Sequence, residues 1–467
     1  MSRRAHTTAG SHTSARPPSP APSRRTRPAH GSGGPLPCRT PAVPTSVRTS
    51  AALAFPSVGR PAPVDPFLFA TGVENSYPTI AGPDGRPRRV DLLDKCGHYV
   101  RWEQDFALAR DLGVRALRWG APYYRAHLGP DRYDWSWSDA PLARLRALGI
   151  APILDLCHFG VPDWLDGFRD PAFPVLFAEY ARQAARRYPW VRHWTPVNEM
   201  FVCANFSAML GWWNERGTGD ASFVRTLRNL CMAHELAVEA ILGEIPDAII
   251  VQAESIEHFH AAGAAAEAHA ARWNAIRFLT LDLTTGTPLA PGMAGYLNAH
   301  GVTANDLAFF RERRAVGRRW LGTDYYPTCE HRVSSRGRVT TERRQPLGFA
   351  GVARQYWERY GLPLFHCETN VRSAHAPAWL ALQWGEVERL RAAGVPVVGF
   401  TWFSLTDQID WHVALREERN ELHSVGLYDL ARRERPVGAA YRALVAGHAA
   451  LPMWPEDAAP APALRTA

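Results

Sequence analysis

The chain alternates short apolar runs with longer stretches in which apolar residues recur at helical spacing. The short runs predict buried strands over 67–73, 114–120, 150–157, 191–198, 248–255, 320–326, 362–368 and 395–403. The longer stretches predict helices near 101–112, 138–148, 171–187, 221–243, 265–282, 346–359, 376–393 and 435–446. Eight strands, each followed by a helix, indicate an α/β chain folded as a (β/α)8 TIM barrel rather than an open doubly wound sheet.

Glycine positions support this reading. Gly149 and Gly394 stand between a predicted helix and the next strand, where a glycine often ends a helix. No Gly-x-Gly-x-x-Gly follows the first strand, which weighs against a dinucleotide-binding fold.

Composition divides the chain into three parts. Residues 1–63 are rich in Pro, Ser and Arg and predict a disordered tail, or a start codon assigned too far upstream. Residues 64–450 are expected to form one catalytic barrel domain, and residues 451–467 a second, shorter tail. The first tail has no apolar segment of the length that a secretory signal requires.

Charge, hydropathy and cysteines narrow the class of protein. Residues 1–60 hold nine Arg and no acid, so the remainder has 53 − 9 = 44 basic and 45 acidic residues, a net charge of −1. A near-neutral body gives no argument for binding nucleic acid. No apolar run reaches 18 residues, so no membrane span is expected. Seven scattered Cys without a Cys-x-x-Cys pair indicate reduced thiols, no metal site and a cytoplasmic protein.

Polar side chains stand at or just after the end of every predicted strand. In a (β/α)8 barrel these ends share one face, which carries the chemistry. Each of these polar residues, taken alone, has a structural explanation. Arg118 could form an ion pair in the core, and His158 could be a buried histidine with its hydrogen bonds satisfied. At all eight ends together they indicate a binding face. The candidates are Glu74, Asn75, Arg118, His158, Asn198, Glu199, Glu254, Glu257, Asp324, Tyr325, Tyr326, Glu368, Trp402, Asp410 and Trp411.

Two of these carboxylates, Glu199 and Glu368, end the fourth and seventh strands. A pair of carboxyls about 5–5.5 Å apart is what a retaining glycosidase requires, one as nucleophile and one as acid and then base. The acid must hold its proton at neutral pH, and the nucleophile must stay ionised. Arg118 is placed to support an ionised Glu368, and a hydroxyl from Tyr325 or Tyr326 could do the same. Seventeen Trp fit either sugar stacking or a Trp-rich core.

Several stretches between about 66 and 446 resemble family 1 glycoside hydrolases, the β-glucosidase-like members of the Glu/Glu retaining clan. HWTPVNEM (193–200) is similar to the family's Thr-x-Asn-Glu-Pro motif. The other similar stretches are CGHYVRWEQDFALARDLGVRALRWG, LDLCHFGVPDWL, GTDYYP and GFTWFSLTDQIDW. The resemblance implies hydrolysis of a β-linked glycoside of glucosidase or galactosidase type, a small carbohydrate or glycoside as the only partner, and no cofactor.

The resemblance also implies roles for individual residues. Glu199 matches the acid/base, Glu368 the nucleophile, and Asn198 the residue that binds the sugar 2-hydroxyl. Arg118 matches the Arg that supports the nucleophile. The residues that match the pocket for the non-reducing sugar are His158, Trp402, Asp410 and Trp411.

The chain also departs from the family pattern. Met200 replaces the Pro of the acid/base motif, Cys367-Glu368-Thr369-Asn370 replaces Thr-Glu-Asn-Gly, and Asp410 replaces a Glu. The Gln expected after the first strand is missing, and Glu74 and Asn75 stand nearby. These changes indicate a divergent branch whose sugar specificity is open.

Alternatives remain open for the substrate and for the reaction. The extra acids Glu74, Glu254 and Asp410 fit either an amino sugar or ordinary hydroxyl recognition, and no phosphate-binding set follows Trp411. A transglycosylase of the same fold and a carbohydrate-binding pseudoenzyme are further alternatives. The oligomeric state is not predicted.

Overall fold

The computed structural model describes residues 65–313 and 317–454, so the predicted tail 1–63 and all but the first four residues of the predicted tail 451–467 lie outside the described residues. Eight parallel strands close into a barrel in the order β1-β15-β14-β11-β9-β8-β7-β4. They are β1 (Leu68–Gly72), β4 (Ala116–Trp119), β7 (Ala151–Asp155), β8 (His193–Thr195), β9 (Ile249–Ser255), β11 (Arg318–Asp324), β14 (Leu364–Glu368) and β15 (Val397–Phe403). The predicted TIM barrel is confirmed, and each strand overlaps its predicted run.

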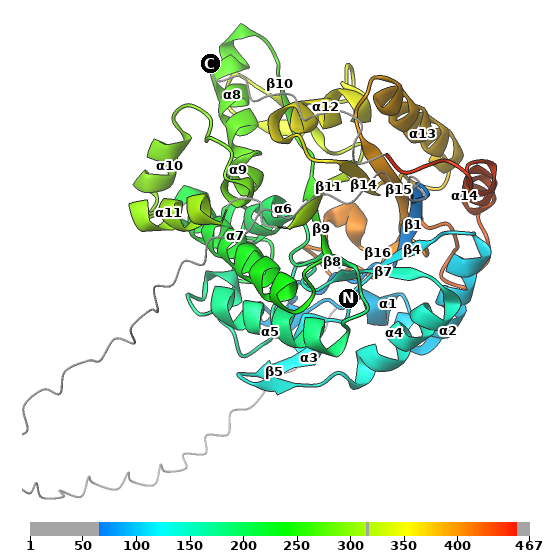
Figure 1. The fold of residues 1–467 in the computed structure, drawn as a ribbon. Coiled ribbons are helices and arrows are strands. Elements are labelled where there is room, and N and C mark those ends of the chain that lie inside the picture. Colours follow the sequence, from blue (N-terminus) through cyan, green and yellow to red (C-terminus); the bar gives the residue numbers. More distant parts are fainter. Residues whose placement is uncertain (1–64, 314–316, 455–467) are drawn as a thin grey trace, which may run out of the picture. The chain divides into compact units, whose positions relative to one another are not determined.

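Helices surround this ring of strands (Figure 1). Those that match predicted helices are α2 (His98–Asp111), α4 (Ser136–Leu148), α5 (Phe173–Arg187), α7 (Gly219–Glu244), α12 (Gly348–Tyr360), α13 (Ala376–Ala392) and α14 (Pro436–Gly447). Gly149 ends α4 in the left-handed conformation (φ 69°), as its position predicts.

One predicted helix is wrong in part. The stretch 265–282 forms two helices, α8 (Glu267–Ile276) and α9 (Leu279–Thr285). The break falls at Arg277, whose buried guanidinium donates a hydrogen bond to the carbonyl of Glu257. Burying a cation requires such acceptors, and turning the chain here brings the guanidinium to one. Apolar spacing alone does not reveal this constraint.

Shorter elements fill the connections, and the sequence pattern did not predict them. The helices are α1 (Leu92–Lys95), α3 (Tyr123–Ala126), α6 (Met200–Ala204), α10 (Met293–Ala299) and α11 (Ala304–Glu312). The strands are β2 (Thr79–Ala81), β3 (Pro87–Arg89), β5 (His127–Gly129), β6 (Arg132–Tyr133), β10 (His258–Ala261), β12 (Glu330–Val333), β13 (Val339–Thr341), β16 (Gln408–Ile409) and β17 (Leu422–His423). Strands β10, β12 and β13 form a small sheet from the connections that follow β9 and β11.

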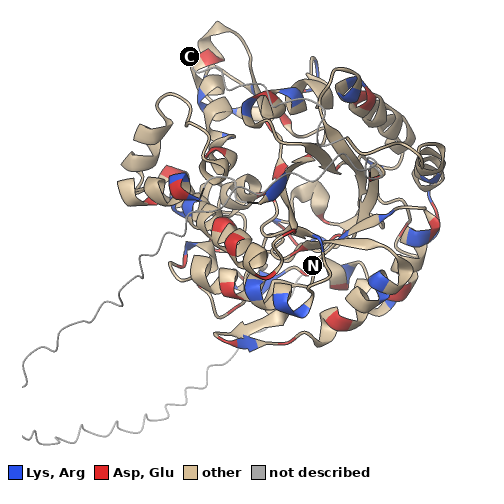
Figure 2. Ribbon diagram, in the orientation of Figure 1, with Lys and Arg blue, Asp and Glu red and all other residues tan. Residues whose placement is uncertain are grey.

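The apolar core has two layers. Residues inside the barrel, among them Ala70, Ile153, Val251 and Phe365, form one cluster, against which Met453 packs. A larger cluster lies between the strands and the helices. Within the described residues no helix is both long and apolar enough to cross a bilayer. Basic and acidic positions are interspersed over the outer helices (Figure 2).

The wall of the barrel is tight where β4 ends. A Cβ added at Gly120 would lie 2.3 Å from the carbonyl oxygen of Asp155 and 2.4 Å from Nδ2 of Asn75. Real Cβ atoms do not approach this closely, so a side chain here would push apart the ends of neighbouring strands.

We expect Gly120→Ala to lower the free energy of unfolding by about 1–3 kcal/mol, because the added methyl must displace backbone. Gly385→Ala is the matched control, since Gly385 lies within α13 and its added Cβ would meet nothing within 4 Å. That change should be neutral or stabilise by about 0.5–1 kcal/mol. Thermal melts of both variants test this, and equal melting temperatures would contradict it.

Candidate active site

A buried guanidinium lies at the centre of the carboxyl-terminal face of the barrel. Arg118, on β4, donates hydrogen bonds to Oε1 of Glu368, to Oδ1 of Asn198 at 2.7 Å and to Oδ2 of Asp155 at 3.4 Å. Only 1% of Arg118 is exposed. A cation is stable there because acceptors from three other strand ends surround it. The arrangement brings together Arg118, Asn198 and Glu368, as the sequence predicts.

Asp155 extends this network to His158. Nδ1 of His158 lies 2.8 Å from Oδ2 of Asp155, and Nδ2 of Asn198 lies 3.3 Å from Nε2 of the same ring. Because the Arg118 hydrogen bond turns the amide nitrogen of Asn198 toward His158, Nε2 accepts and Nδ1 donates. Asp155 is not among the site residues that the sequence predicts. Its signal was a lone carboxylate within the apolar strand IAPILDLC.

Both oxygens of Glu368 accept hydrogen bonds. Arg118 donates to Oε1, and the Tyr326 hydroxyl donates to Oε2 at 2.6 Å. Two donors, one of them cationic, favour the ionised carboxylate. The Tyr325 hydroxyl points elsewhere and donates to Glu330 at 2.7 Å. Of the two tyrosines proposed from the sequence, Tyr326 is therefore the one that contacts Glu368.

The surroundings of Glu199 differ from those of Glu368. Glu199 precedes α6 in the left-handed conformation (φ 42°, ψ 63°), and its N–H donates to the carbonyl of Ala253 at 3.0 Å. Within the described residues its carboxyl accepts no hydrogen bond. Burial raises the pKa of Glu199 well above the ordinary value, and the negative charges of Asp324 and Glu368 raise it further. The left-handed backbone is costly for a residue with a side chain, which is typical of functional sites.

Glu254 lies beside the start of α6. Its Oε2 accepts the N–H of Phe201 at 3.2 Å. Burial raises the pKa of Glu254, and the backbone N–H groups of Phe201 and Met200 oppose this rise. A Pro at position 200 would have no N–H to give. The departure from the family motif at Met200 thus supplies Glu254 with a donor.

Two other predicted carboxylates are occupied by protein donors. Glu74 accepts the N–H of Ser76 at 3.0 Å and the amide of Gln408 at 2.9 Å. Asp410 accepts three backbone N–H groups of the following loop, those of Arg419, Asn420 and Glu421, at 2.8–3.0 Å. These contacts hold the loops around the barrel mouth.

The predicted aromatic residues and Asn75 complete the set. Trp402 is fully buried, and its Nε1 donates to the carbonyl of Val425 at 3.0 Å. Trp411 is half-buried, with ring centroids 6.0 Å from Phe159 and 6.1 Å from Trp213. Asn75 is 3% exposed. Phe159 and Trp213, the aromatic neighbours of Trp411, are not among the site residues that the sequence predicts.

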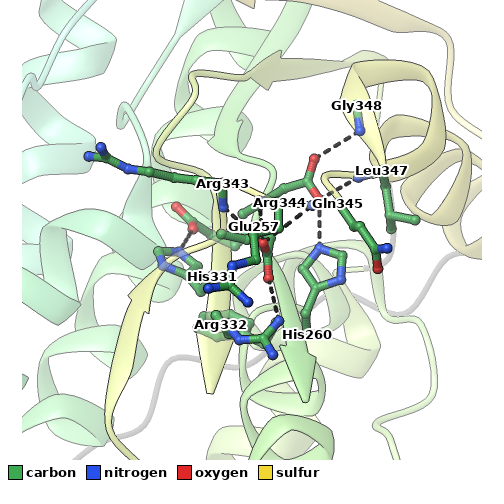
Figure 3. Close-up of polar contacts among 12 residues, drawn as sticks. Glu257, His260, His331, Arg332, Arg343, Arg344, Gln345, Leu347 and Gly348 are labelled. Carbon is green, nitrogen blue, oxygen red and sulfur yellow. Dashed lines mark hydrogen bonds and ion pairs between the residues drawn. The ribbon is translucent and has the colours of Figure 1, made fainter. Parts of the chain in front are cut away.

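Polar contacts join the small sheet of β10, β12 and β13 to the segment that leads into α12 (Figure 3). Glu330 accepts the N–H groups of Leu347 and Gly348 at 2.7 and 2.9 Å and contacts His260 at 2.7 Å. Glu257 forms an ion pair with His331. This network was not predicted, because it depends on pairing between strands of three or four residues.

Several buried polar atoms of the mouth have no hydrogen-bond partner among residues 65–313 and 317–454. They are Nδ2 of Asn75, Oε1 of Glu254, both carboxyl oxygens of Asp324 and Nε1 of Trp411. Such atoms are uncommon in protein interiors, and a ligand rich in hydroxyls would satisfy them. Across residues 65–313 and 317–454, no group of three or more His, Cys, Asp or Glu is arranged to hold a metal ion.

Comparison with known proteins agrees with this geometry. The sequence profile of Glycosyl hydrolase family 1 matches residues 91–279. The chain is 28% identical over 179 residues to β-glucosidase A of Thermotoga maritima, covering 36% of this chain and 40% of that protein. It is 32% identical over 161 residues to a bifunctional β-D-glucosidase/β-D-fucosidase of Bifidobacterium breve, covering 31% and 34%. The chain thus spans about two fifths or less of the length of these curated relatives.

The fold is similar over a longer stretch. A β-glucosidase from Thermotoga maritima in complex with deoxynojirimycin superposes with a TM-score of 0.68 at 20% identity, covering 82% of this chain and 98% of that one. Residues 91–279 therefore show distant homology to the β-glucosidase-like glycoside hydrolases of family 1, and the barrel fold is shared over most of the chain.

Proposed function

We propose that the protein is a retaining β-glycosidase in which Glu368 is the nucleophile and Glu199 the acid/base. The observation that carries this proposal is the contrast between the two carboxyls. Glu368 has donors on both oxygens, whereas Glu199 is buried beside other acids and accepts no hydrogen bond from any residue that the structure describes. Two carboxyls with opposite environments are the pattern of an acid and a nucleophile in one site.

The proposed reaction has two steps. An oxygen of Glu368 attacks the anomeric carbon while Glu199 gives its proton to the leaving glycosidic oxygen, which leaves as an alcohol. Glu199, now ionised, then takes a proton from water as that water displaces Glu368. Arg118 and Tyr326 hold Glu368 ready for attack and receive it back as a leaving carboxylate. If a sugar hydroxyl replaces the water, the same residues perform transglycosylation.

We assign the surrounding residues to sugar binding. The side-chain oxygen of Asn198 accepts a hydrogen bond from Arg118, and one amide hydrogen is donated to His158. The second amide hydrogen is left to bind the sugar 2-hydroxyl. His158 contacts Asn198, and Trp411 packs against Phe159, the residue that follows His158. The aromatic face of Trp411 can pack on a sugar ring. The names of the relatives indicate β-glucosides and β-fucosides as first substrates to test.

The occupied carboxylates favour a neutral sugar. The carboxyl oxygens of Glu74 and Asp410 accept hydrogen bonds from protein donors, and one oxygen of Glu254 accepts the N–H of Phe201 at the start of α6. Burial raises the pKa of Glu254 to about 8, so at neutral pH it offers little negative charge to an ammonium group. We therefore favour ordinary hydroxyl recognition over an amino sugar.

We expect Glu368→Ala to abolish turnover of nitrophenyl β-glycosides and azide or formate to restore part of it, because a small anion can enter the space left by the carboxylate. Glu388→Ala, on the exposed outer face of α13, is the control and should keep full activity. Intact mass after treatment with a 2-fluoro glycosyl fluoride should show one covalent adduct in the wild type. A folded Glu368→Ala that anions do not rescue, or a wild type that is not labelled, would argue against the nucleophile or for a pseudoenzyme.

The loss of activity on replacing the proposed acid, Glu199, should depend on the leaving group of the substrate. We expect Glu199→Gln to lower kcat/KM by about 10²–10⁴-fold for alkyl glycosides and far less for dinitrophenyl glycosides, which leave without a proton. Because the acid acts only while protonated, wild-type activity should persist above the ordinary Glu range and fall at alkaline pH as Glu199 ionises. Equal losses for both kinds of substrate would contradict this assignment.

Glu254 should make stability depend on pH. Its folded pKa of about 8 exceeds the ordinary 4.5, so between these values the folded protein holds a proton that the unfolded chain releases. Stability that is present below pH 4.5 is therefore lost as pH rises, by roughly 1.4 kcal/mol per unit at most. Glu254→Gln keeps an oxygen for Phe201 and cannot ionise, so its melting temperature should fall less between pH 5.5 and 8. Parallel curves for the two proteins would contradict this.

A further inference from the structure

A pocket of about 450 Å³ lies in the helical layer around the barrel, and none of the described residues that line it belongs to the candidate active site. It forms where α7 meets the short 3-10 helix Gly167–Arg169 and the turn between α10 and α11. Helices α7, α10 and α11 lie on one side of the ring of strands (Figure 1). Small-molecule pockets in proteins have volumes of about 300–1,000 Å³, so a ligand of metabolite size fits here.

Hydrogen bonds hold the walls of this pocket together. Nδ2 of Asn229, on α7, donates to the carbonyl of Phe168 at 3.0 Å, and its Oδ1 accepts Nη1 of Arg228 at 3.1 Å. Nη2 of Arg228 donates to Oδ1 of Asp306, on α11, at 2.5 Å. The pocket is therefore built into the packing of these elements, as a preformed ligand site requires.

The lining of the pocket is cationic. Arg169, Arg225 and Arg228 line it together with His300, and no acidic residue stands among the described residues of the lining. Arg225 and Arg228 lie three positions apart on α7, so they share one face of the helix. Guanidinium groups gathered around one hollow repel one another, and an anion placed between them would relieve this repulsion.

The protein occupies only part of the donor capacity of these arginines. Arg169 donates from Nε and Nη2 to the two carboxyl oxygens of Asp166, at 2.9 and 2.6 Å. Nε of Arg228 is buried and has no partner in the part of the chain that the structure describes. Arg225 is exposed and forms no hydrogen bond or ion pair within residues 65–313 and 317–454. Donors are thus left for an anion from outside the chain.

The number of guanidinium groups favours a phosphate over a carboxylate. The pair of Arg169 and Asp166 shows that one guanidinium satisfies both oxygens of a carboxylate. A phosphate monoester has three terminal oxygens and a charge of about −1.5 to −2 at neutral pH, so it can engage several guanidinium groups at once. The pocket is larger than a phosphate group, and Pro171 and Val302 give it apolar surface for an organic remainder.

The surroundings favour a small ligand over a long polyanion. Basic and acidic positions alternate over the outer helices (Figure 2), so a nucleic acid that entered the pocket would meet acidic residues beyond it. A small phosphorylated molecule is held by the cationic lining alone.

We propose that this pocket is a second ligand site, separate from the candidate active site, that binds the phosphate monoester of a small molecule. Arg225 and Arg228 bind the phosphate oxygens, and Arg169 and His300 contribute further donors. No bond forms or breaks in the ligand. The inference does not depend on the proposed glycosidase activity, and its tests need no glycoside.

The first test is calorimetric titration of the full chain at low salt with inorganic phosphate, ribose 5-phosphate and adenosine monophosphate. Ribose, adenosine and succinate are the matched ligands that lack the phosphate. We expect at least one of the two monoesters to bind more tightly than inorganic phosphate, and its affinity to fall as salt is added. Absence of binding by both monoesters would overturn the proposal. Equally tight binding of succinate or of an unphosphorylated partner would overturn the assignment to phosphate.

The second test locates the binding. Arg225→Gln and Arg228→Gln should each weaken binding of the monoester by about tenfold, because each removes charged donors from the phosphate. Arg225→Lys should lose less, since it keeps the charge and gives up only the paired donors of the guanidinium. Arg225 is exposed and has no partner among the described residues, so its variants should melt at the wild-type temperature.

Arg144→Gln is the matched control. Arg144 is an exposed arginine on α4, outside the pocket, and makes no hydrogen bond or ion pair with any residue that the structure describes. It should bind the monoester as tightly as the wild type does. Wild-type affinity in Arg225→Gln, or an equal loss in Arg144→Gln, would show that the anion binds elsewhere or without a defined site.

Discussion

The site depends on one buried cation. Arg118 enters the barrel from β4 and holds acceptors from β7, β14 and the segment that follows β8. Without its charge, three strand ends would present acidic or amide oxygens to one another with no donor between them, and such groups are costly to bury. The same guanidinium orients Asn198, and through Asn198 it fixes which nitrogen of His158 accepts. One side chain thus donates to Glu368 and also orients the neighbouring sugar-binding candidates.

The balance of charge around Arg118 distinguishes the two halves of the mouth. On the side of Glu368, each carboxyl oxygen has a donor, and negative charge is stable. On the side of Glu199 and Glu254, burial outweighs the available donors, so protons are retained. A barrel can maintain this difference over a short distance because each strand end contributes side chains from a fixed direction. The small sheet of β10, β12 and β13 adds to it by holding Tyr325 on Glu330, which leaves Tyr326 for Glu368.

The sequence predicted the barrel well because strand and helix periods are local properties. All eight strands and most of the helices could be placed from the recurrence of apolar residues, and Glu199 and Glu368 from their positions at strand ends. The split of 265–282 could not be predicted, since it depends on where a single buried Arg277 finds an acceptor. Asp155 and the different partners of Tyr325 and Tyr326 were also beyond the sequence, because side-chain direction and neighbours on distant strands decide them. The roles of the candidate residues stay predictions.

The contacts of Glu254 at the start of α6 limit which substitutions the chain tolerates at positions 200 and 254. Glu254 accepts the N–H of Phe201, and the N–H of Met200 also acts on it, so the identity of position 200 and the acid on β9 are linked. Restoring the family's Pro at position 200 alone would remove a donor from a buried carboxyl, while removing Glu254 alone would leave the first N–H groups of the helix without an acceptor. The two positions therefore constrain each other, and we expect either change made alone to lower the stability of the fold.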